Sequence, residues 1–279
     1  MQFGMPTLVE NRTLEENAAL CAELGLSFIE LNMNFPEYQL GFLERTDELL
    51  AAADRFGIYF TVHLDENLDV ADFNPLVAGA WLETVRRTAA AAKKLLPLRG
   101  GSGPLILNMH MNHGVHITLP DRKVRMYERS FDTYMSSFAR FRALAEEWIG
   151  GEDLVISIEN TDGFADHEKK AVELLLESPC FGLTWDIGHS KSSREADVPF
   201  LLGRADRIVH FHVHDGTELP PRDHLALGDG ETDLALRLEQ AEELGVRCVL
   251  ETKTSEALRR SAQWLRERSY LPKSPEARR

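Results

Sequence analysis

Histidine and carboxylate side chains recur at the ends of short apolar segments along this 279-residue chain. Glu159 ends LVISIE, Asp186 ends FGLTWD, Glu251 follows RCVL, and histidines alternate with apolar residues in IVHFHVH. Mixed imidazole and carboxylate sites suit Zn²⁺, Mn²⁺, Co²⁺ or Fe²⁺, whereas Mg²⁺ and Ca²⁺ prefer oxygen ligands alone. Burying several carboxylates together without a cation would be costly. The pattern therefore predicts one bound divalent transition metal and leaves a second open.

Such a site permits two chemistries. A metal that polarises a carbonyl, flanked by carboxylates on opposite faces, supports proton transfer at the adjacent carbon. Two or three metals together can instead generate hydroxide that attacks a phosphodiester. The residue types by themselves leave this choice open.

The elements that must position these residues alternate between β-rich and amphipathic segments. The predicted strands are 2–8, 27–34, 58–64, 104–111, 153–160, 181–188, 207–215 and 247–253. The predicted helices are 13–24, 44–56, 76–96, 124–148, 168–176, 231–244 and 255–268, and 199–205 is at most a short helix. Eight such units of about 35 residues predict an α/β fold, a single (β/α)₈ TIM barrel. An open doubly wound sheet is the alternative, but no GxGxxG motif follows the first strand. We expect one barrel domain over residues 1–272 and a polar C-terminal tail over 273–279.

Alternation within each strand separates the barrel interior from its exterior, because successive side chains point to opposite faces. Apolar residues such as Phe60, Leu107 and Trp185 share the parity that faces the helices. In seven strands the other parity carries an ionisable or metal-binding side chain near the end of the strand. The C-terminal strand ends form the active-site face of such barrels. We therefore expect these side chains to converge there.

Composition restricts the partners. The 31 basic and 45 acidic residues leave a net charge of −14, which disfavours nucleic acid as a partner. No apolar run has the length of a membrane span, and the N-terminal residues lack the pattern of a secretory signal. Cys21, Cys180 and Cys248 are isolated and fit no disulfide framework. We expect a cytoplasmic protein that acts on a small molecule without a membrane partner, and a homodimer is left open.

Several motifs in order resemble one known family. They are ISIENTDGF with Glu159, TWDIGHS with Asp186 and His189, HFHVHD with His212, HLALGDGETDL with His224, and VLETK with Glu251. Together they resemble the xylose isomerase-like barrel superfamily, which includes sugar isomerases and epimerases, dehydratases and endonuclease IV-type apurinic-site nucleases. The resemblance implies a metal held by Glu159, Asp186, His212 and Glu251, in which Glu159 and Glu251 are also the catalytic acid–base pair.

The resemblance also implies roles for further residues. His63, His110, His189 and His224 match positions that bind a second metal or contact substrate in different branches. The nuclease branch has an aspartate where this chain has Arg222, and Asp223 is expected to face differently. A third metal, and phosphodiester cleavage with it, are therefore disfavoured.

Four inward residues near the strand ends are expected to contact substrate: Glu30, Asn32, His214 and Lys253. Lys253 could bind a substrate carboxylate or phosphate, or form a surface ion pair. The glycines of LGDGETDL either present backbone N–H groups to an anion or sugar hydroxyl, or form a plain turn. The basic residues Arg122, Lys123 and Arg125 either bind phosphate or lie on a solvated surface.

The leading hypothesis is a divalent-metal-dependent isomerase or epimerase that acts on a small sugar or related polyhydroxylated carbonyl compound. Proton transfer between Glu159 and Glu251 would be the chemical step. A dehydratase on a related polyol or keto acid uses the same proton abstraction and is one alternative. An endonuclease IV-like apurinic-site phosphodiesterase and a metal-binding barrel without catalysis are the others.

Overall fold

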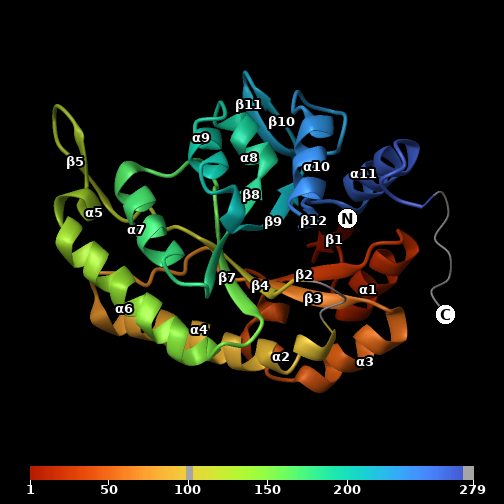
Figure 1. The fold of residues 1–279 in the computed structure, drawn as a ribbon, viewed down its shortest axis with the longest axis horizontal. Helices are drawn as coiled ribbons and strands as arrows, with labels where there is room; N and C mark the ends of the chain where they lie inside the picture. The colour runs from red at the N-terminus through yellow and green to blue at the C-terminus, as the bar shows by residue number, and fades with distance from the viewer. Residues whose placement is uncertain (99–102, 273–279) are drawn as a thin grey trace.

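Eight parallel strands close into a barrel in the computed structural model, which describes residues 1–98 and 103–272 (Figure 1). The order around the barrel is β1-β12-β9-β8-β7-β4-β3-β2. The bounds are β1 (Gln2–Pro6), β2 (Phe28–Asn32), β3 (Tyr59–His63), β4 (Leu105–His110), β7 (Leu154–Glu159), β8 (Phe181–Asp186), β9 (Ile208–Val213) and β12 (Arg247–Leu250). The predicted (β/α)₈ TIM barrel is confirmed. The predicted tail at 273–279 lies outside the described residues.

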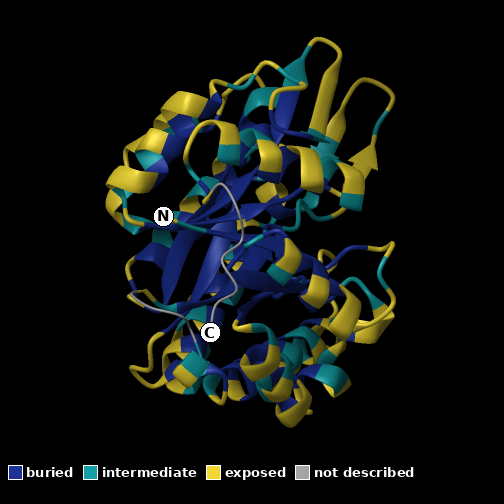
Figure 2. Cartoon of the chain, turned by 90° about the vertical axis from the view of Figure 1, so that its right-hand side faces the viewer, coloured by how far each residue is buried: buried dark blue, intermediate teal, exposed yellow. Residues whose placement is uncertain are grey.

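Helices follow the strands and surround the barrel, with buried inner and exposed outer faces (Figure 2). They are α1 (Leu14–Glu23), α3 (Thr46–Phe56), α4 (Pro75–Lys93), α6 (Phe131–Ile149), α7 (Asp166–Leu176), α8 (Ile187–Ser192), α9 (Val198–Leu202), α10 (Leu234–Glu243) and α11 (Ser255–Glu267). Local signals set their ends: Thr13 and Glu16 form a capping box at the start of α1, and Gly57 ends α3 in the left-handed conformation. No helix of the described chain has the length and apolar character needed to cross a membrane.

The helix predicted over 124–148 is wrong at its start. The structure has β6 (Lys123–Arg125), α5 (Met126–Arg129) and then α6, and the break falls at Ser130, whose backbone is not helical. β6 pairs with β5 (His116–Thr118) in an antiparallel hairpin that the sequence pattern did not predict. A second unpredicted hairpin joins β10 (Asp215–Glu218) to β11 (Pro221–Leu225). Both hairpins lie in loops after strands, outside the regular alternation of the barrel.

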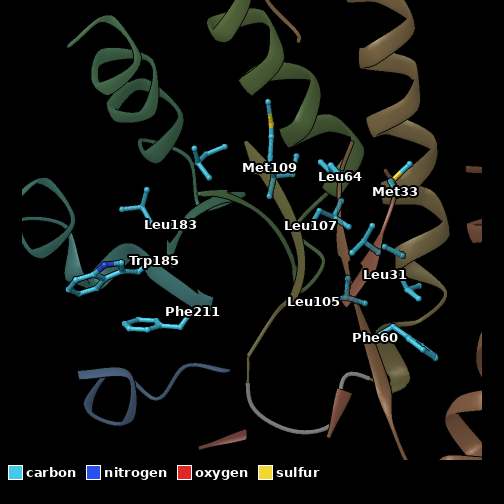
Figure 3. Close-up of a cluster of buried hydrophobic side chains, with 14 of the residues drawn as sticks. Leu31, Met33, Phe60, Leu64, Leu105, Leu107, Met109, Leu183, Trp185 and Phe211 are labelled. Atoms are coloured by element: carbon cyan, nitrogen blue, oxygen red, sulfur yellow. The ribbon is translucent and has the colours of Figure 1, made fainter. Parts of the chain in front are cut away.

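The predicted parity of the strands is confirmed in the core. Phe60, Leu107, Met109, Trp185 and Phe211 point outward and pack between strands and helices (Figure 3). Fully buried parallel strands need such apolar exteriors because helices cover them.

The opposite parity fills the barrel interior. At one end Phe28, Tyr59 and Val249 form a separate apolar cluster, in which the rings of Phe28 and Tyr59 stack with centroids 5.0 Å apart. We call this three-residue cluster the interior plug. Gly4 makes room for it, because a Cβ atom at that position would lie 2.6 Å from the Phe28 ring. The polar residues gather above the plug, toward the C-terminal strand ends.

Candidate functional site

Four buried side chains converge at the C-terminal end of the barrel: Glu159 on β7, Asp186 on β8, His212 on β9 and Glu251 directly after β12. Each offers one ligand atom, and these atoms lie within 4.8 Å of one another. The Nδ1 atom of His212 lies 3.0 Å from Oε2 of Glu251 and 3.3 Å from Oε2 of Glu159. Exposure of the four residues is 0–4%. The barrel thus collects four ligand-type groups from four different strand ends.

The charges of this four-residue cluster depend on one another. Burial opposes ionisation of Glu159, but the imidazoles of His212 and His110 outweigh it and hold the pKa of this carboxyl well below its usual range. Burial of Glu251 is likewise outweighed, by Lys253 and His212, and its pKa is also well lowered. Burial disfavours the charged form of His212, yet the surrounding glutamates raise its pKa well above the usual value. The raised pKa of His212 shows that the surrounding carboxylates favour positive charge at this position.

The donor set fits a divalent transition metal. Nδ1 of His212 and Oε2 of Glu251 are buried and have no aligned hydrogen-bond partner, although they lie close to each other. Unpaired buried polar atoms are costly, and a cation placed between them would satisfy both. One imidazole with three carboxylates is a donor set typical of Zn²⁺, Mn²⁺, Co²⁺ or Fe²⁺ sites. These four residues could therefore hold one such ion.

A second group shares Glu159. His63 and His110 place their Nε2 atoms 3.1 Å apart, and Nε2 of His110 lies 3.1 Å from Oε2 of Glu159. Nδ1 of His63 lies 2.8 Å from the carbonyl oxygen of Leu64, so it carries the ring proton and leaves Nε2 free to accept. Burial lowers the pKa of His63, as does the neighbouring His110. This group could hold a second ion, with Glu159 as a bridge between the two.

Three further histidines, His189, His214 and His224, gather beside the main cluster. Burial and the nearby His214 lower the pKa of His224 to about 4. Arg222 is exposed on β11, whereas Oδ2 of Asp223 lies 3.6 Å from Nδ1 of His189. Asp223 thus faces the histidines, contrary to the expectation from its sequence position, because the β10–β11 hairpin carries it over α8.

Two of the four residues predicted to contact substrate are enclosed by other protein groups, and the other two line a cavity. Glu30 is 1% exposed and lies beneath His212, where Oε1 is 2.9 Å from Nε2 of that ring. The Thr61 hydroxyl donates to Oε2 of Glu30 at 3.0 Å. His214 is also fully buried. Asn32 and Lys253, in contrast, line an open cavity.

This cavity has a volume of 260 Å³ and lies at the ends of β1, β2 and β12. Lys253 joins it to the cluster, since its Nζ atom lies 2.8 Å from Oε1 of Glu251. The full lining is Pro6, Thr7, Leu8, Val9, Asn32, Asn34, Phe35, Glu66 and Lys253. Thr7 and Glu66 are polar lining residues that sequence patterns did not indicate. A larger cavity of 620 Å³ lies outside the barrel between α1 and α3, and its lining includes no residue of the cluster.

The geometry shows which group the glycine loop of LGDGETDL holds. The backbone N–H groups of Gly228 and Gly230 donate to Oδ2 of Asp215, and those of Gly216 and Thr232 donate to Oδ1. An internal carboxylate therefore occupies the glycine loop. The basic residues Arg122 and Arg125 belong to the β5–β6 hairpin and pair with Asp121 and Glu128.

A further polar group forms around His113, a histidine of the loop after β4 that the sequence left open as a ligand or a solvent-exposed residue. His113, after β4, lies 2.6 Å from Glu168 through Nδ1 and 2.6 Å from Asp162 through Nε2. Hydrogen bonds to Asp162 and Glu168 raise the pKa of His113 to about 10. Through these contacts His113 connects the loop after His110 to the segment after Glu159. Sequence spacing did not indicate the partners of His113, because they lie about 50 residues away along the chain.

The fold and this cluster define a class of proteins: single (β/α)₈ barrels with a buried histidine–carboxylate centre at the C-terminal strand ends. The chain belongs to the xylose isomerase-like TIM barrel family, which it matches over residues 18–268. No curated protein matches the sequence.

Solved structures share the fold at low sequence identity. A D-tagatose 3-epimerase-like protein superposes with a TM-score of 0.72 at 20% identity, over 97% of both chains. The 3-keto-D-glucoside 4-epimerase of E. coli has a TM-score of 0.74 at 18% identity, over 96% of this chain and 99% of that one. A probable 3-DHS dehydratase of Bacillus anthracis has a TM-score of 0.63 at 13% identity, over 95% and 98%.

Proposed function

We propose that the protein is a divalent-metal-dependent isomerase or epimerase acting on a small sugar or related polyhydroxylated carbonyl compound. The observation that carries the proposal is the placement of two glutamates, Glu159 and Glu251, within one buried four-ligand cluster beside a small cavity. The epimerase names of similar structures agree with it. Glu159, Asp186, His212 and Glu251 would hold the ion.

The two glutamates approach the cluster from different sides, since β8 and β9 separate β7 from β12 in the barrel. A bound divalent ion supplies Lewis-acid stabilisation of the negative charge that develops on substrate oxygens. One glutamate accepts the proton from the carbon next to the carbonyl, and the C–H electron pair moves into the carbonyl system. The other glutamate first takes up a proton from solvent and delivers it to the opposite face, which inverts that carbon. Delivery to the neighbouring carbon instead, with transfer of the hydroxyl proton to the former carbonyl oxygen, isomerises the compound.

Neighbouring side chains hold the two glutamates in place. Asn108 donates to Oε2 of Glu159 through its amide. Nζ of Lys253 binds Oε1 of Glu251, which leaves Oε2 directed at the cluster. Fixed carboxylates favour proton transfer because less reorganisation is needed in the transition state.

The cavity suits a small polar substrate. Its 260 Å³ is below the ~300–1,000 Å³ of typical ligand pockets. Thr7, Asn32 and Lys253 offer hydrogen bonds to hydroxyl groups, and Phe35 supplies an apolar wall. In this proposal Asn32 and Lys253 contact substrate directly, and His189 and His224 lie at the edge of the site.

Hydrogen exchange from solvent tests the proposal. Metal-loaded protein is incubated in D₂O with a panel of ketopentoses, ketohexoses and their phosphates, and NMR detects deuterium at the carbon next to the carbonyl. We expect exchange by the wild type and a loss of about 10²–10⁴-fold in Glu159→Gln and Glu251→Gln. Glu168→Gln is the matched control, since Glu168 is equally buried but outside the cluster. Unchanged exchange in both active-site variants would overturn the assignment.

Two alternatives share the site. A dehydratase would begin with the same proton abstraction, and loss of water from a polyol or keto acid in the same NMR assay would identify it. The His63–His110–Glu159 group favours the second metal that a phosphodiesterase requires. Cleavage of an abasic-site duplex by zinc-loaded protein would favour the nuclease. We further propose a cytoplasmic location, which agrees with three buried cysteines that form no disulfide.

A further inference from the structure

His214, directly after β9, has both ring nitrogens engaged by protein groups. Its Nδ1 accepts the backbone N–H of His224 at 2.7 Å and also lies 3.2 Å from the carbonyl oxygen of Asp215. Nε2 lies 3.0 Å from Oδ2 of Asp186, and because a carboxylate oxygen accepts, Nε2 carries a proton and donates it to Asp186. The side chain has 0% exposure. Neither nitrogen is available to substrate or metal in this arrangement.

The carboxylate that His214 contacts is held on both oxygens. Asp186 is the N-cap of α8, and its Oδ1 accepts the backbone N–H of His189 at 2.6 Å. Its Oδ2 accepts from His214 and lies 3.9 Å from Nδ1 of His212, on the side of the four-ligand cluster. A carboxylate has about four lone-pair positions, so two hydrogen bonds leave room for a metal. These two hydrogen bonds fix the orientation of the Asp186 carboxylate.

Gly188 makes this arrangement sterically possible. A Cβ atom at position 188 would lie 2.0 Å from Nδ1 of His214 and 2.1 Å from its Cε1. These distances are far below van der Waals contact, and the ring fills the space where any other residue would place its side chain. The glycine of TWDIGHS therefore admits the imidazole against the first turn of α8.

We propose that His214 is a positioning residue that orients Asp186 toward the divalent metal, and that Gly188 admits its ring for this purpose. The inference rests on the proposed function, since it requires a metal in the four-ligand cluster. Hydrogen-bond partners of ligating carboxylates fix their direction, and their loss typically weakens metal binding about 10–100-fold. The role differs from the substrate contact that the sequence position of His214 suggested.

Two substitutions separate the two hydrogen bonds of His214. In His214→Gln the side-chain amide can still donate to Asp186, at the place of Nε2. In His214→Asn the amide oxygen can still accept from His224, at the place of Nδ1, but the shorter side chain cannot reach Asp186. We expect His214→Asn to raise the dissociation constant for Co²⁺ by about 10–100-fold, and His214→Gln to stay near the wild type. Calorimetry and the cobalt absorption spectrum measure this, with thermal melts in parallel.

Gly188→Ala perturbs the same contact without changing His214. We expect it to weaken Co²⁺ binding as His214→Asn does. The double variant should lose no more Co²⁺ affinity than either single variant, because all three remove the same hydrogen bond between His214 and Asp186. His167→Asn is the matched control at another buried histidine. It should leave the Co²⁺ dissociation constant unchanged.

The outcomes distinguish this inference from the proposed function. Wild-type protein that binds no divalent metal overturns both. Wild-type binding that is unchanged in His214→Asn, or equal losses in His214→Asn and His214→Gln, overturns the positioning role alone. Should the variants not fold, ¹⁵N NMR of zinc-loaded wild type decides: a proton on Nε2 of His214 supports the inference, and an unprotonated Nε2 overturns it.

Discussion

Metal binding should raise the thermal stability of the protein, and the four-ligand cluster allows the size of the effect to be worked out. The ligand atoms already lie within 4.8 Å of one another, so binding needs little rearrangement, and an unfolded chain has no such cluster. A metal at 100 times its dissociation constant stabilises the native state by about 2.7 kcal/mol. At about 2–4 °C per kcal/mol, the expected rise in Tm is about 5–11 °C.

Removal of one ligand should abolish most of this rise. If Glu251→Gln binds 100-fold more weakly, the same metal concentration equals its dissociation constant and the gain falls to about 0.4 kcal/mol, or about 1–2 °C. The assay is differential scanning calorimetry of chelator-treated protein with and without Mn²⁺ or Co²⁺, with Glu168→Gln as control. An equal rise in Glu251→Gln and wild type would refute the reasoning, because the ion would then bind elsewhere.

Three further predictions concern other parts of the molecule. Hydrogen bonds to Asp162 and Glu168 raise the folded-state pKa of His113 to about 10, above the ~6.5 of an unfolded chain. The stabilisation is therefore complete below about pH 6.5 and lost as pH rises through about 10. Melts at several pH values should show the Tm deficit of His113→Gln greatest at pH 6 and closed above pH 10; a constant deficit contradicts this. Phe28→Ala, in the fully buried interior plug, should reduce the free energy of unfolding by about 3–5 kcal/mol in a urea titration, and a change below 1 kcal/mol would be inconsistent with the plug. Lys253→Met should raise KM for an exchanging substrate more than it changes the metal dissociation constant, and the reverse order would show that Lys253 acts by holding Glu251 and not by contacting substrate.

Local sequence patterns predicted most of the fold because the signals that begin and end strands and helices lie within the segments themselves. Alternating parity, capping residues and helix-terminal glycines act within a few residues, so the strands and most helices follow from them. The predicted helix at 124–148 was wrong at its start because its first residues pair with His116–Thr118 in a hairpin, a contact that periodicity does not indicate. The β10–β11 hairpin was missed for the same reason, and with it the approach of Asp223 to His189.

The sequence by itself determined which side chains face the barrel interior. His210, His212 and His214 share one parity in a single strand segment, and this parity is enough to direct them inward. Parity does not determine at which height along the barrel axis each of these histidines lies.

The tertiary structure decided the heights, through the register between neighbouring strands. Pairing of Asp186 with His212 and of Thr184 with His210 places His212 at the level of the carboxylates and His210 one layer lower. Register is set by how eight strands close around the plug and by packing against the helices, and no single segment contains that information. The same closure buried Glu30 beneath His212 and brought His214 against Gly188.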